Sequence, residues 1–247
     1  MATQLKHLNH FNRRFSFVGL ACQHHIQLNH TLLNQVIKTG DTVIDATVGN
    51  GNDTLFLSRA LSGPSGETGR LYGFDIQQGA INNTERLLAE NLSTADKMDQ
   101  VLLSVRNHKS FPDSISPRSV KAIVYNLGYL PGQNTDKSIK TEAADTVQSI
   151  TNALDLVCKG GLISIMCYRG HDGGREEASA VDSIVGQLCS PTTPSISPPR
   201  PCWSRSSRNK INNLPLTVMP LTNPLRGAGE KEGGQGRGSS TALLLIA

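Results

Sequence analysis

Residues 43–54 read Val-Ile-Asp-Ala-Thr-Val-Gly-Asn-Gly-Asn-Asp-Thr, a stretch that passes from apolar residues through two glycines into an amphipathic segment. This pattern predicts a buried strand over 42–44, a tight turn over Gly49 and Gly51, and a helix that starts near Asp53. Glycine permits positive φ and lets a ligand approach the backbone closely. The N-terminus of a helix adds unpaired N–H groups and partial positive charge. The stretch therefore predicts a binding site for a nucleotide-like molecule, although a Gly-x-Gly pair can also be a plain turn.

The acidic residues around this turn restrict the kind of ligand that it can take. A dinucleotide site of the G-x-G-x-x-G type would have a third glycine where Thr54 stands. Asp45 and Asp53 would repel a pyrophosphate, whereas they would attract a cofactor that has a positive charge and no phosphate. S-adenosylmethionine fits this description, because it carries a sulfonium, an ammonium and a ribose. An NAD(P)-dependent dehydrogenase shares the strand, the glycine turn and the helix, and it is the weaker alternative.

A further acid follows at the distance expected for a ribose ligand. Residues 69–76 predict a short strand that ends near Asp75, 24 residues beyond Gly51. An acid at the end of the second strand of a βαβ unit accepts hydrogen bonds from ribose hydroxyls, and the alternative is a helix N-cap or a solvated loop acid. Gln77 lies close enough in sequence to add a contact. His108 follows the third predicted strand, where it could touch the adenine or play only a structural role.

Strand patterns alternate with helix patterns through the middle of the chain. This alternation predicts an α/β fold with a doubly wound, mostly parallel sheet, which is Rossmann-like as in class I methyltransferases. Such a methyltransferase normally has seven strands, of which the last two form an antiparallel hairpin at one edge. The predicted strands span 42–44, 69–76, 101–105, 120–126 and 162–168, and the predicted helices span 29–37, 53–61, 78–91, 141–157 and a segment from about 176.

The two ends of the chain differ in composition from its middle. Residues 1–40 contain four basic residues and no acidic ones, and residues 191–247 contain seven basic residues, two acidic ones and eight of the twelve prolines. We therefore predict a basic leader over 1–27 and a disordered Pro/Ser/Gly-rich tail over 189–247. The residues between them, 28–188, hold the predicted S-adenosylmethionine site and are expected to form the methyltransferase domain. The leader suits a chloroplast or mitochondrial transit peptide, and the alternative is a cytoplasmic protein with a disordered basic end.

Neither a metal site nor a membrane span is expected. The five cysteines form no Cys-x-x-Cys pair and no His/Cys spacing typical of metal ligands, so we expect reduced thiols and no metal. No apolar run has the length of a transmembrane helix, and the final run, 242–247, is far too short.

Three motifs together resemble one known family. They are residues 43–54, Asn-Leu-Gly-Tyr-Leu-Pro-Gly at 126–132 and Tyr-Arg-Gly-His-Asp-Gly-Gly-Arg-Glu-Glu at 168–177. Over about residues 30–188 the chain resembles the YtqB/MnmM-like class I methyltransferases, which are also labelled as rRNA methylases. Members of that family methylate the aminomethyl group of 5-aminomethyl-2-thiouridine at the wobble position of tRNA. The resemblance implies an S-adenosylmethionine-dependent enzyme whose partner is tRNA.

The resemblance also implies roles for single residues. Asn126, Tyr129 and His171 are implied to face the substrate, and we treat them as the expected catalytic residues. We expect Asn126 to orient the amine and Tyr129 to stack on the uridine base. His171 would accept a proton, or else only order its loop. The expected cofactor-binding residues are Asp45, Thr47, Gly49, Asn50, Gly51, Asn52, Asp53, Asp75, Gln77 and His108.

The tail departs from the family pattern. Family members end with two further strands, and here a Pro/Ser/Gly-rich tail stands in their place, so we predict that the chain lacks the edge hairpin. An inactive or unstable truncated isoform is therefore the main alternative, and a small-molecule or protein methyltransferase on the same fold is another. Lys137, Arg169 and Arg175 are expected to contact tRNA phosphates. A homodimer stays open.

Overall fold

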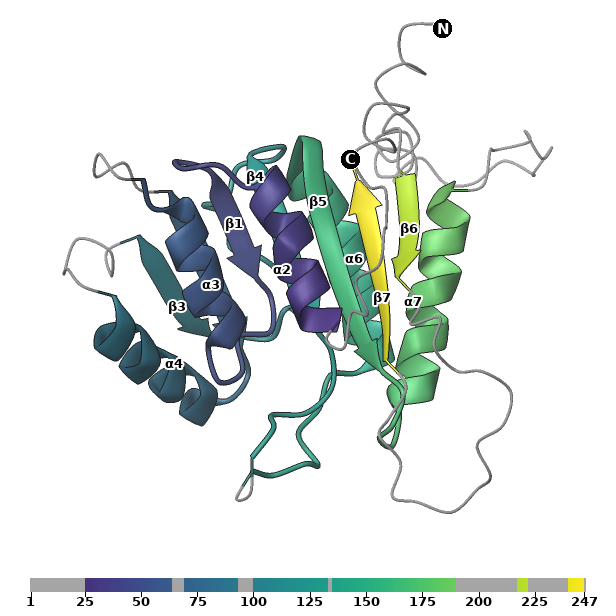
Figure 1. Ribbon diagram of the computed structural model, residues 1–247. Helices are drawn as coiled ribbons and strands as arrows, with labels where there is room; N and C mark the ends of the chain where they lie inside the picture. The colour runs from purple at the N-terminus through teal and green to yellow at the C-terminus, as the bar shows by residue number, and fades with distance from the viewer. Residues whose placement is uncertain are drawn as a thin grey trace, which may run out of the picture.

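The computed structural model describes residues 25–63, 69–92, 100–132, 135–189, 217–221 and 240–246. Within these ranges strands and helices alternate from the first strand to the last helix before residue 190. Almost all of the predicted leader and most of the tail lie outside the described residues, so the transit peptide and the domain boundaries stay predictions. The described elements form one sheet with helices on both of its faces (Figure 1).

The sheet has the strand order β3-β2-β1-β4-β5-β7-β6 among the described residues. Strands β1 to β5 pair in parallel, whereas β7 pairs antiparallel with both β5 and β6. The predicted α/β fold with a parallel sheet is confirmed for these five strands. The bounds are β1 Thr42–Asp45, β2 Arg70–Asp75, β3 Val101–Val105, β4 Val120–Asn126, β5 Val157–Tyr168, β6 Thr217–Leu221 and β7 Ser240–Ile246.

The helices lie in two layers because each strand-to-strand crossover places its helix on one side of the sheet. Helices α2, α3 and α4 lie in front of the sheet in Figure 1, and α6 lies behind it. Helix α7 packs against α6 and β5. The bounds are α2 His25–Val36, α3 Asn52–Leu61, α4 Gln78–Asn91, α6 Ala143–Leu156 and α7 Gly174–Cys189.

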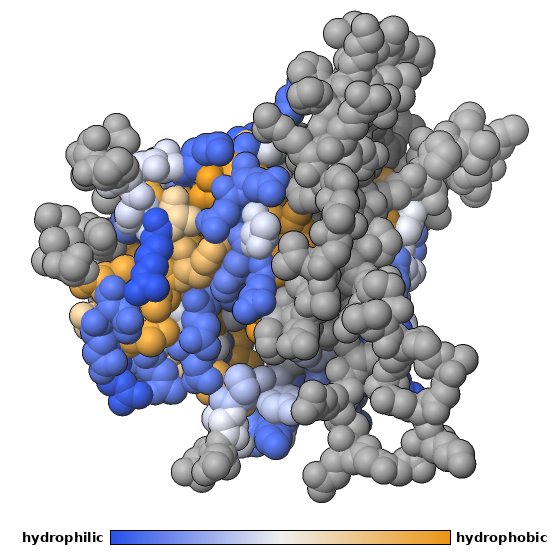
Figure 2. Space-filling view, in the orientation of Figure 1, coloured by the Kyte–Doolittle hydropathy of each residue, from blue (hydrophilic) through white to orange (hydrophobic). Residues whose placement is uncertain are grey.

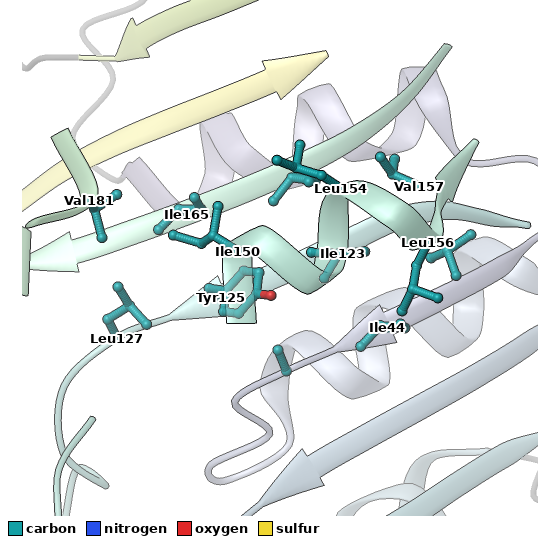
Figure 3. Packing of buried hydrophobic residues seen from close by; sticks show 14 of the residues in the cluster. Ile44, Ile123, Tyr125, Leu127, Ile150, Leu154, Leu156, Val157, Ile165 and Val181 are labelled. Atoms are coloured by element: carbon teal, nitrogen blue, oxygen red, sulfur yellow. The ribbon is translucent and has the colours of Figure 1, made fainter. Parts of the chain in front are cut away.

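Alternating side chains of the central strands build two separate hydrophobic cores. Along β4, Ala122 and Val124 belong to the core beneath α2 and α3, whereas Ile123 and Tyr125 belong to the core beneath α6 and α7. Figure 3 shows the second core, with α6 lying across it. Since successive side chains of a strand point to opposite faces, a strand that is buried on both sides reads as a continuous apolar run. This explains why the strands could be located from the sequence.

The prediction that the last two strands are missing is wrong. Strand β7 lies beside β5 and pairs with it from Leu162 to Tyr168, and β6 pairs with the other edge of β7. The pattern beyond residue 189 therefore includes two strands, Thr217–Leu221 and Ser240–Ile246, that the composition of the tail concealed. The edge of β5 is covered, which removes the reason for regarding the chain as a truncated isoform.

Two features of the sequence hid this hairpin. Pro220 lies inside β6, and a proline argues against a central strand because it has no N–H to donate. It is compatible with β6 because β6 is the outermost strand of the described sheet, next to β7 alone. The apolar run of β7 was read only as too short for a membrane helix, although a run of this length is typical of a buried strand.

The visible surface is mainly hydrophilic over the helices, with hydrophobic residues showing between them (Figure 2). Amphipathic helices produce this arrangement because their apolar sides pack on the sheet. No helix in the described ranges is both long and apolar enough to cross a membrane.

Candidate active site

A cleft of about 660 Å³ opens at the carboxyl ends of the parallel strands. The strand order reverses between β1 and β4, and ligands of open α/β sheets bind at this kind of switch point. Residues that follow all five parallel strands line the cleft, together with Ile26 of α2. The topology therefore brings together side chains that are more than one hundred residues apart in the chain.

The glycine turn forms the floor of the cleft between β1 and α3. Gly49 has φ 55° and Gly51 has φ 83°, a backbone conformation that favours glycine. A Cβ on Gly49 would have Leu130 as its nearest side chain at 3.6 Å, whereas a Cβ on Gly51 would stand 2.6 Å from Oγ1 of Thr84 in α4. Gly49 thus faces the cleft, and Gly51 is required for the close approach of α4.

Asp75 fastens the end of β2 to the glycine turn. Its Oδ2 accepts a hydrogen bond from the amide of Gly49 at 2.9 Å, and its Oδ1 accepts one from the amide of Gln77 at 2.9 Å. Burial raises the pKa of the Asp75 carboxyl, although these amides act in the opposite direction. Each carboxylate oxygen has a second lone-pair site, so Asp75 can still accept hydrogen bonds from a ligand in the cleft.

Asp45 lies beneath the cleft rather than in its wall. Its side chain is almost fully buried, and it accepts hydrogen bonds from Oγ1 of Thr54 at 2.7 Å and from the amide of Thr47 at 3.2 Å. Burial, and then the nearby charge of Asp53, raises the pKa of Asp45 to about 7. The geometry therefore suits a residue that supports the turn from below.

Asp53 connects the start of α3 with helix α2 and with the end of β4. Its Oδ1 lies 2.6 Å from Nε2 of His30 in α2, and its Oδ2 accepts a hydrogen bond from Nδ2 of Asn126 at the end of β4. The amide of Asn126 also donates to Oγ1 of Thr47 at 2.7 Å. Helix α2, the start of α3, the end of β4 and the turn after β1 are thus held at one point by polar contacts.

The loop that follows β4 is held across the cleft. Asn50 Nδ2 donates to the carbonyl of Pro131 at 2.9 Å. The hydroxyl of Thr141 accepts from the amide of Gly128 at 2.7 Å and donates to Oε2 of the buried Glu177 at 2.7 Å. These contacts fix a Gly- and Pro-containing segment that would otherwise have many conformations.

Tyr129 and His171 lie together at the mouth of the cleft. Their rings meet edge to face at 5.5 Å between centroids, and the ammonium of Lys137 lies 5.4 Å from the Tyr129 ring. Tyr129 is 36% exposed, which leaves part of its surface available to a planar group. His171 Nδ1 lies 2.9 Å from the carbonyl of Asp172, which can only accept, so the proton of the neutral ring is on Nδ1.

Asn126 and His171 each carry a buried polar atom without a partner. Within the described part of the chain, Asn126 Oδ1 and His171 Nε2 are closed to solvent and make no hydrogen bond. Unsatisfied buried polar atoms are rare in folded proteins and call for an explanation, such as a missing ligand. Both residues line the cleft, so the unpartnered atoms belong to side chains at the place where a ligand would bind.

His108 lies deeper, between the cleft and α6. Its ring is buried, its Nε2 lies 3.5 Å from Oγ1 of Thr146, and it meets the Tyr125 ring edge to face at 6.0 Å. Burial lowers the pKa of His108 to about 4, so the ring is neutral at pH 7. The neighbouring Asn107 is fixed by a 2.5 Å hydrogen bond to Asp145. His108 can therefore contact a neutral ring system.

The cleft contains most of the side chains that the sequence predicted. Two of the expected residues, Asp45 and Gly51, do not line it, and they act through the turn and α4 instead. Its walls carry several carboxylates and one lysine, and that lysine, Lys140, pairs with Asp172 at 2.5 Å. The expected residues that line the cleft are Thr47, Gly49, Asn50, Asn52, Asp53, Asp75, Gln77, His108, Asn126, Tyr129 and His171.

Sequence reasoning missed His30 and the buried Glu177. His30 belongs to a helix that precedes the first strand, where no motif marks a site. The signal that could have found it is a polar pair, Asn29 and His30, in an otherwise amphipathic helix; Asn29 is buried and accepts a 2.7 Å hydrogen bond from Ser164 of β5. No group of three or more His, Cys, Asp or Glu residues suited to a metal occurs among the described residues.

A family model and a curated relative match the chain. The family model, described as "Putative rRNA methylase", matches residues 71–197. The relative is the chloroplastic tRNA (mnm(5)s(2)U34)-methyltransferase of Arabidopsis thaliana, which is 40% identical over 163 residues, or 66% of this chain. The chain spans 59% of the length of that relative.

Two solved structures match nearly the whole chain. A "putative rRNA-methylase" from Clostridium thermocellum has a TM-score of 0.67 and 30% identity, and the match covers 92% of this chain and 99% of that chain. A "putative methyltransferase" from Streptococcus mutans, solved in complex with SAH, has a TM-score of 0.61 and 26% identity, with 91% and 98% covered. Both matches extend over the part of the chain that holds the cleft.

Proposed function

The chain belongs to the family described as "Putative rRNA methylase", and from this premise we propose that it is an S-adenosylmethionine-dependent methyltransferase that acts on a modified wobble uridine of tRNA. The acceptor is the amine of a 5-aminomethyl group. The observation that carries the proposal is the cleft at the switch point of the sheet. There Asp75 at the end of β2 and the glycine turn line the same cleft as Asn126 at the end of β4.

The chemistry of the cleft supports the cofactor. Asp75, Glu142 and Asp145 line it, and carboxylates favour a molecule with a sulfonium and an ammonium over a dinucleotide. Asp75 would accept from the ribose hydroxyls, and the backbone at Gly49 leaves room for close approach. The Streptococcus mutans relative was solved with SAH. A dehydrogenase is disfavoured by the same charges and by the family.

S-adenosylmethionine bound in this cleft supplies an electrophilic methyl group, and the protein has to align a neutral amine with it. Asn126 would accept an N–H of that amine through its unpartnered Oδ1. His171, whose Nε2 carries a lone pair, would take up the proton that the methylated amine releases. Alignment and exclusion of water supply most of the rate gain in a displacement of this kind.

The wobble uridine is proposed as the substrate because of the mouth of the cleft and because of the relative. Tyr129 is partly exposed and offers a face for base stacking. Lys137 stands beside it, whereas Arg169 is paired with Asp182 at 2.8 Å and would have to exchange that partner for a phosphate. The Arabidopsis relative is a tRNA (mnm(5)s(2)U34)-methyltransferase. A small-molecule methyltransferase is the second candidate, and the aromatic mouth argues against it.

The proposed location is the chloroplast. The acid-free, basic composition of residues 1–27 supports a transit peptide, and the Arabidopsis relative is chloroplastic. A fusion of these residues to a fluorescent protein tests the location, since the fusion would stay in the cytosol if they carry no targeting signal. The homodimer stays a prediction, which the mass of the purified protein in solution would check.

The decisive experiment incubates the purified chain with S-adenosylmethionine and tRNA that carries 5-aminomethyl-2-thiouridine. Mass spectrometry of the digested nucleosides should show a gain of one methyl group on that uridine. The matched control is the same tRNA with an unmodified wobble uridine, which should gain none. Methylation of the control, or of free small amines instead of tRNA, would contradict the proposal, as would a folded chain that binds no SAH.

A further inference from the structure

Both oxygens of the Asp53 carboxylate are occupied by other side chains of the protein. Oδ1 lies 2.6 Å from Nε2 of His30, and Oδ2 accepts from Nδ2 of Asn126. Asp53 itself is nearly buried, at 9% exposure. A carboxylate in this arrangement has its strongest interactions with the protein, although the residue also lines the cleft. This differs from Asp75, whose partners in the described part of the chain are backbone amides.

The contact with Asp53 determines which way the Asn126 amide points. An ionised carboxylate can only accept, so the NH₂ group of Asn126 must face Asp53 and its Oδ1 must face away. That Oδ1 is buried and unpartnered among the described residues. Rotating the amide by half a turn would place its oxygen against a carboxylate oxygen, which is repulsive. The backbone of Asn126 cannot shift to relieve this, because its amide is held by Thr47 at 2.7 Å.

His30 holds the carboxylate from its other side. Its ring lies parallel to the ring of Phe56 of α3, with 3.8 Å between centroids and 2° between planes. This stacking fixes the direction in which Nε2 meets Asp53. The chain of contacts therefore runs from Phe56 through His30 and Asp53 to the amide of Asn126.

We propose that Asp53, held by His30, is a positioning residue that keeps the carbonyl oxygen of Asn126 turned toward the acceptor amine. This assigns Asp53 to the substrate side of the site and not to cofactor binding, and it deepens the proposed function on which it rests. The observation behind it is the pairing of a fully engaged carboxylate with an amide whose oxygen is left free.

The orientation of the Asn126 amide matters because the lone pair of the acceptor nitrogen must stay free to attack the methyl carbon. In the transfer the nitrogen lone pair forms the new C–N bond while the C–S bond breaks and its electron pair stays on sulfur; the methylated ammonium then loses a proton to a base. An Asn126 oxygen accepts an N–H of the amine and leaves the lone pair free for the methyl carbon. A reversed amide would instead donate to that lone pair and block the reaction.

The test is a double-mutant cycle of Asp53→Ala and Asn126→Ala on the full chain. We expect Asp53→Ala to lower kcat roughly 10- to 100-fold and to change the Kd of SAH less than about threefold, a change that we treat as negligible. If Asp53 acts through Asn126, removing it from the Asn126→Ala variant should cost no further activity. Asp113→Ala, which removes an exposed carboxylate, is the control and should change neither constant.

The proposal would be overturned if the double variant lost as much kcat as the product of the losses in the two single variants. It would also be overturned if Asp53→Ala weakened SAH binding as much as it lowered kcat. His30→Phe keeps the ring stacking on Phe56 and removes the N–H, so it gives a milder form of the same test if Asp53→Ala does not fold. We expect His30→Phe to lower kcat in the native chain and to leave kcat unchanged in the Asn126→Ala variant.

A second measurement does not depend on methyl transfer. The side-chain NH₂ resonances of Asn126, identified by their absence in Asn126→Ala, should be protected from solvent exchange and should lose this protection in Asp53→Ala. Unchanged resonances in Asp53→Ala would overturn the positioning role even if tRNA is methylated. Shifted resonances in a chain that does not methylate tRNA would support the positioning role and reject the proposed substrate.

Discussion

The carboxylate of Asp75 accepts a hydrogen bond from the amide of Gly49 at 2.9 Å, and this contact fixes the glycine turn to the end of β2. The other carboxylate oxygen of Asp75 accepts a hydrogen bond from the amide of Gln77. One side chain therefore holds two walls of the cleft, the glycine turn and the segment that follows β2. The residue is thus expected to bind the ribose and to shape the turn beneath it.

Replacing Asp75 by alanine should weaken SAH binding by roughly 10- to 100-fold, since hydrogen bonds to a charged group contribute about 1.5–3 kcal/mol each. Calorimetric titration with SAH measures the effect. Asp75→Asn should lose less affinity, because its amide oxygen still accepts one of the two backbone hydrogen bonds. Equal binding by Asp75→Ala and the native chain would show that the ribose is held elsewhere.

Gly51→Ala should destabilise the protein more than a glycine substitution elsewhere. Its φ of 83° disfavours any other residue, and the new Cβ would stand 2.6 Å from Oγ1 of Thr84. We expect a loss of about 1–3 kcal/mol in the free energy of unfolding, measured in urea. Gly186→Ala is the matched control, because nothing lies within 4 Å of its Cβ position in α7, and it should be neutral or stabilising.

The clash at Gly51 can be separated from the backbone strain. Adding Thr84→Ala to Gly51→Ala removes the hydroxyl that the new methyl would meet, so part of the lost stability should return. The part that does not return measures the strain of positive φ. A complete recovery would mean that φ contributes nothing, which would contradict the backbone argument.

Because of the titration of Asp45, the free energy of unfolding should fall as the pH rises from about 4 to 7. Its pKa is raised from 3.8 to about 7 in the folded state, so in this window the folded protein holds a proton that the unfolded chain has released. The folded state is therefore disfavoured progressively up to about pH 7, and the loss is complete above it. Burial raises the pKa of Asp75 too, which acts in the same direction.

Asp45→Asn removes the titrating group while keeping an oxygen for Thr54. The free energy of unfolding of the variant relative to the native chain should rise between pH 4.5 and pH 8 by an amount on the order of a few kcal/mol. Urea unfolding at the two pH values measures it, and Asp113→Asn serves as an exposed control. A relative stability that does not change with pH would mean that Asp45 titrates normally in the folded protein.

Most of the parallel part of the fold could be predicted because strands β1, β2, β4 and β5 are buried on both faces. The predicted limits of β3 and β4 agree with the structure. Strand β5 begins earlier than predicted, at Val157. The segment Lys159–Gly161 resembles a helix cap, yet the strand passes through it with a shift of register between Val120 and Ala122 of β4. Such an irregularity depends on the neighbouring strand and leaves no pattern in the sequence.

The candidate site could be predicted where a motif follows a strand and not where a contact comes from elsewhere. Asn126 and Asp75 stand at strand ends, which the sequence identifies. The partner of Asp53, His30, lies in a helix before the sheet, and only folding brings the two within 2.6 Å. The hairpin of β6 and β7 was missed for the same reason, because β7 pairs with the distant strand β5, and β6 pairs only with β7 in the described sheet.

Removing residues 190–247 should make the chain aggregate. Strand β7 pairs with β5 over seven residues, so its loss would expose a long, unpaired edge. Comparing the soluble fraction of the truncated and full chains after expression tests this. Leu244→Pro is a finer variant, because it places a proline in a strand that pairs on both sides with Ser164 and Met219. A soluble, monodisperse truncated chain would mean that β5 needs no cover.

Tyr129→Ala should weaken tRNA binding without changing the affinity for SAH. Stacking of one base contributes about 1–3 kcal/mol, which corresponds to roughly 5- to 150-fold in Kd. Tyr129→Phe keeps the ring and its edge-to-face contact with His171, so it should bind tRNA nearly as well as the native chain. Fluorescence anisotropy with a labelled anticodon stem-loop measures both. An alanine variant that binds as tightly as the phenylalanine variant would exclude stacking on Tyr129, and the mouth of the cleft would then have to recognise its substrate through Lys137 and backbone contacts alone.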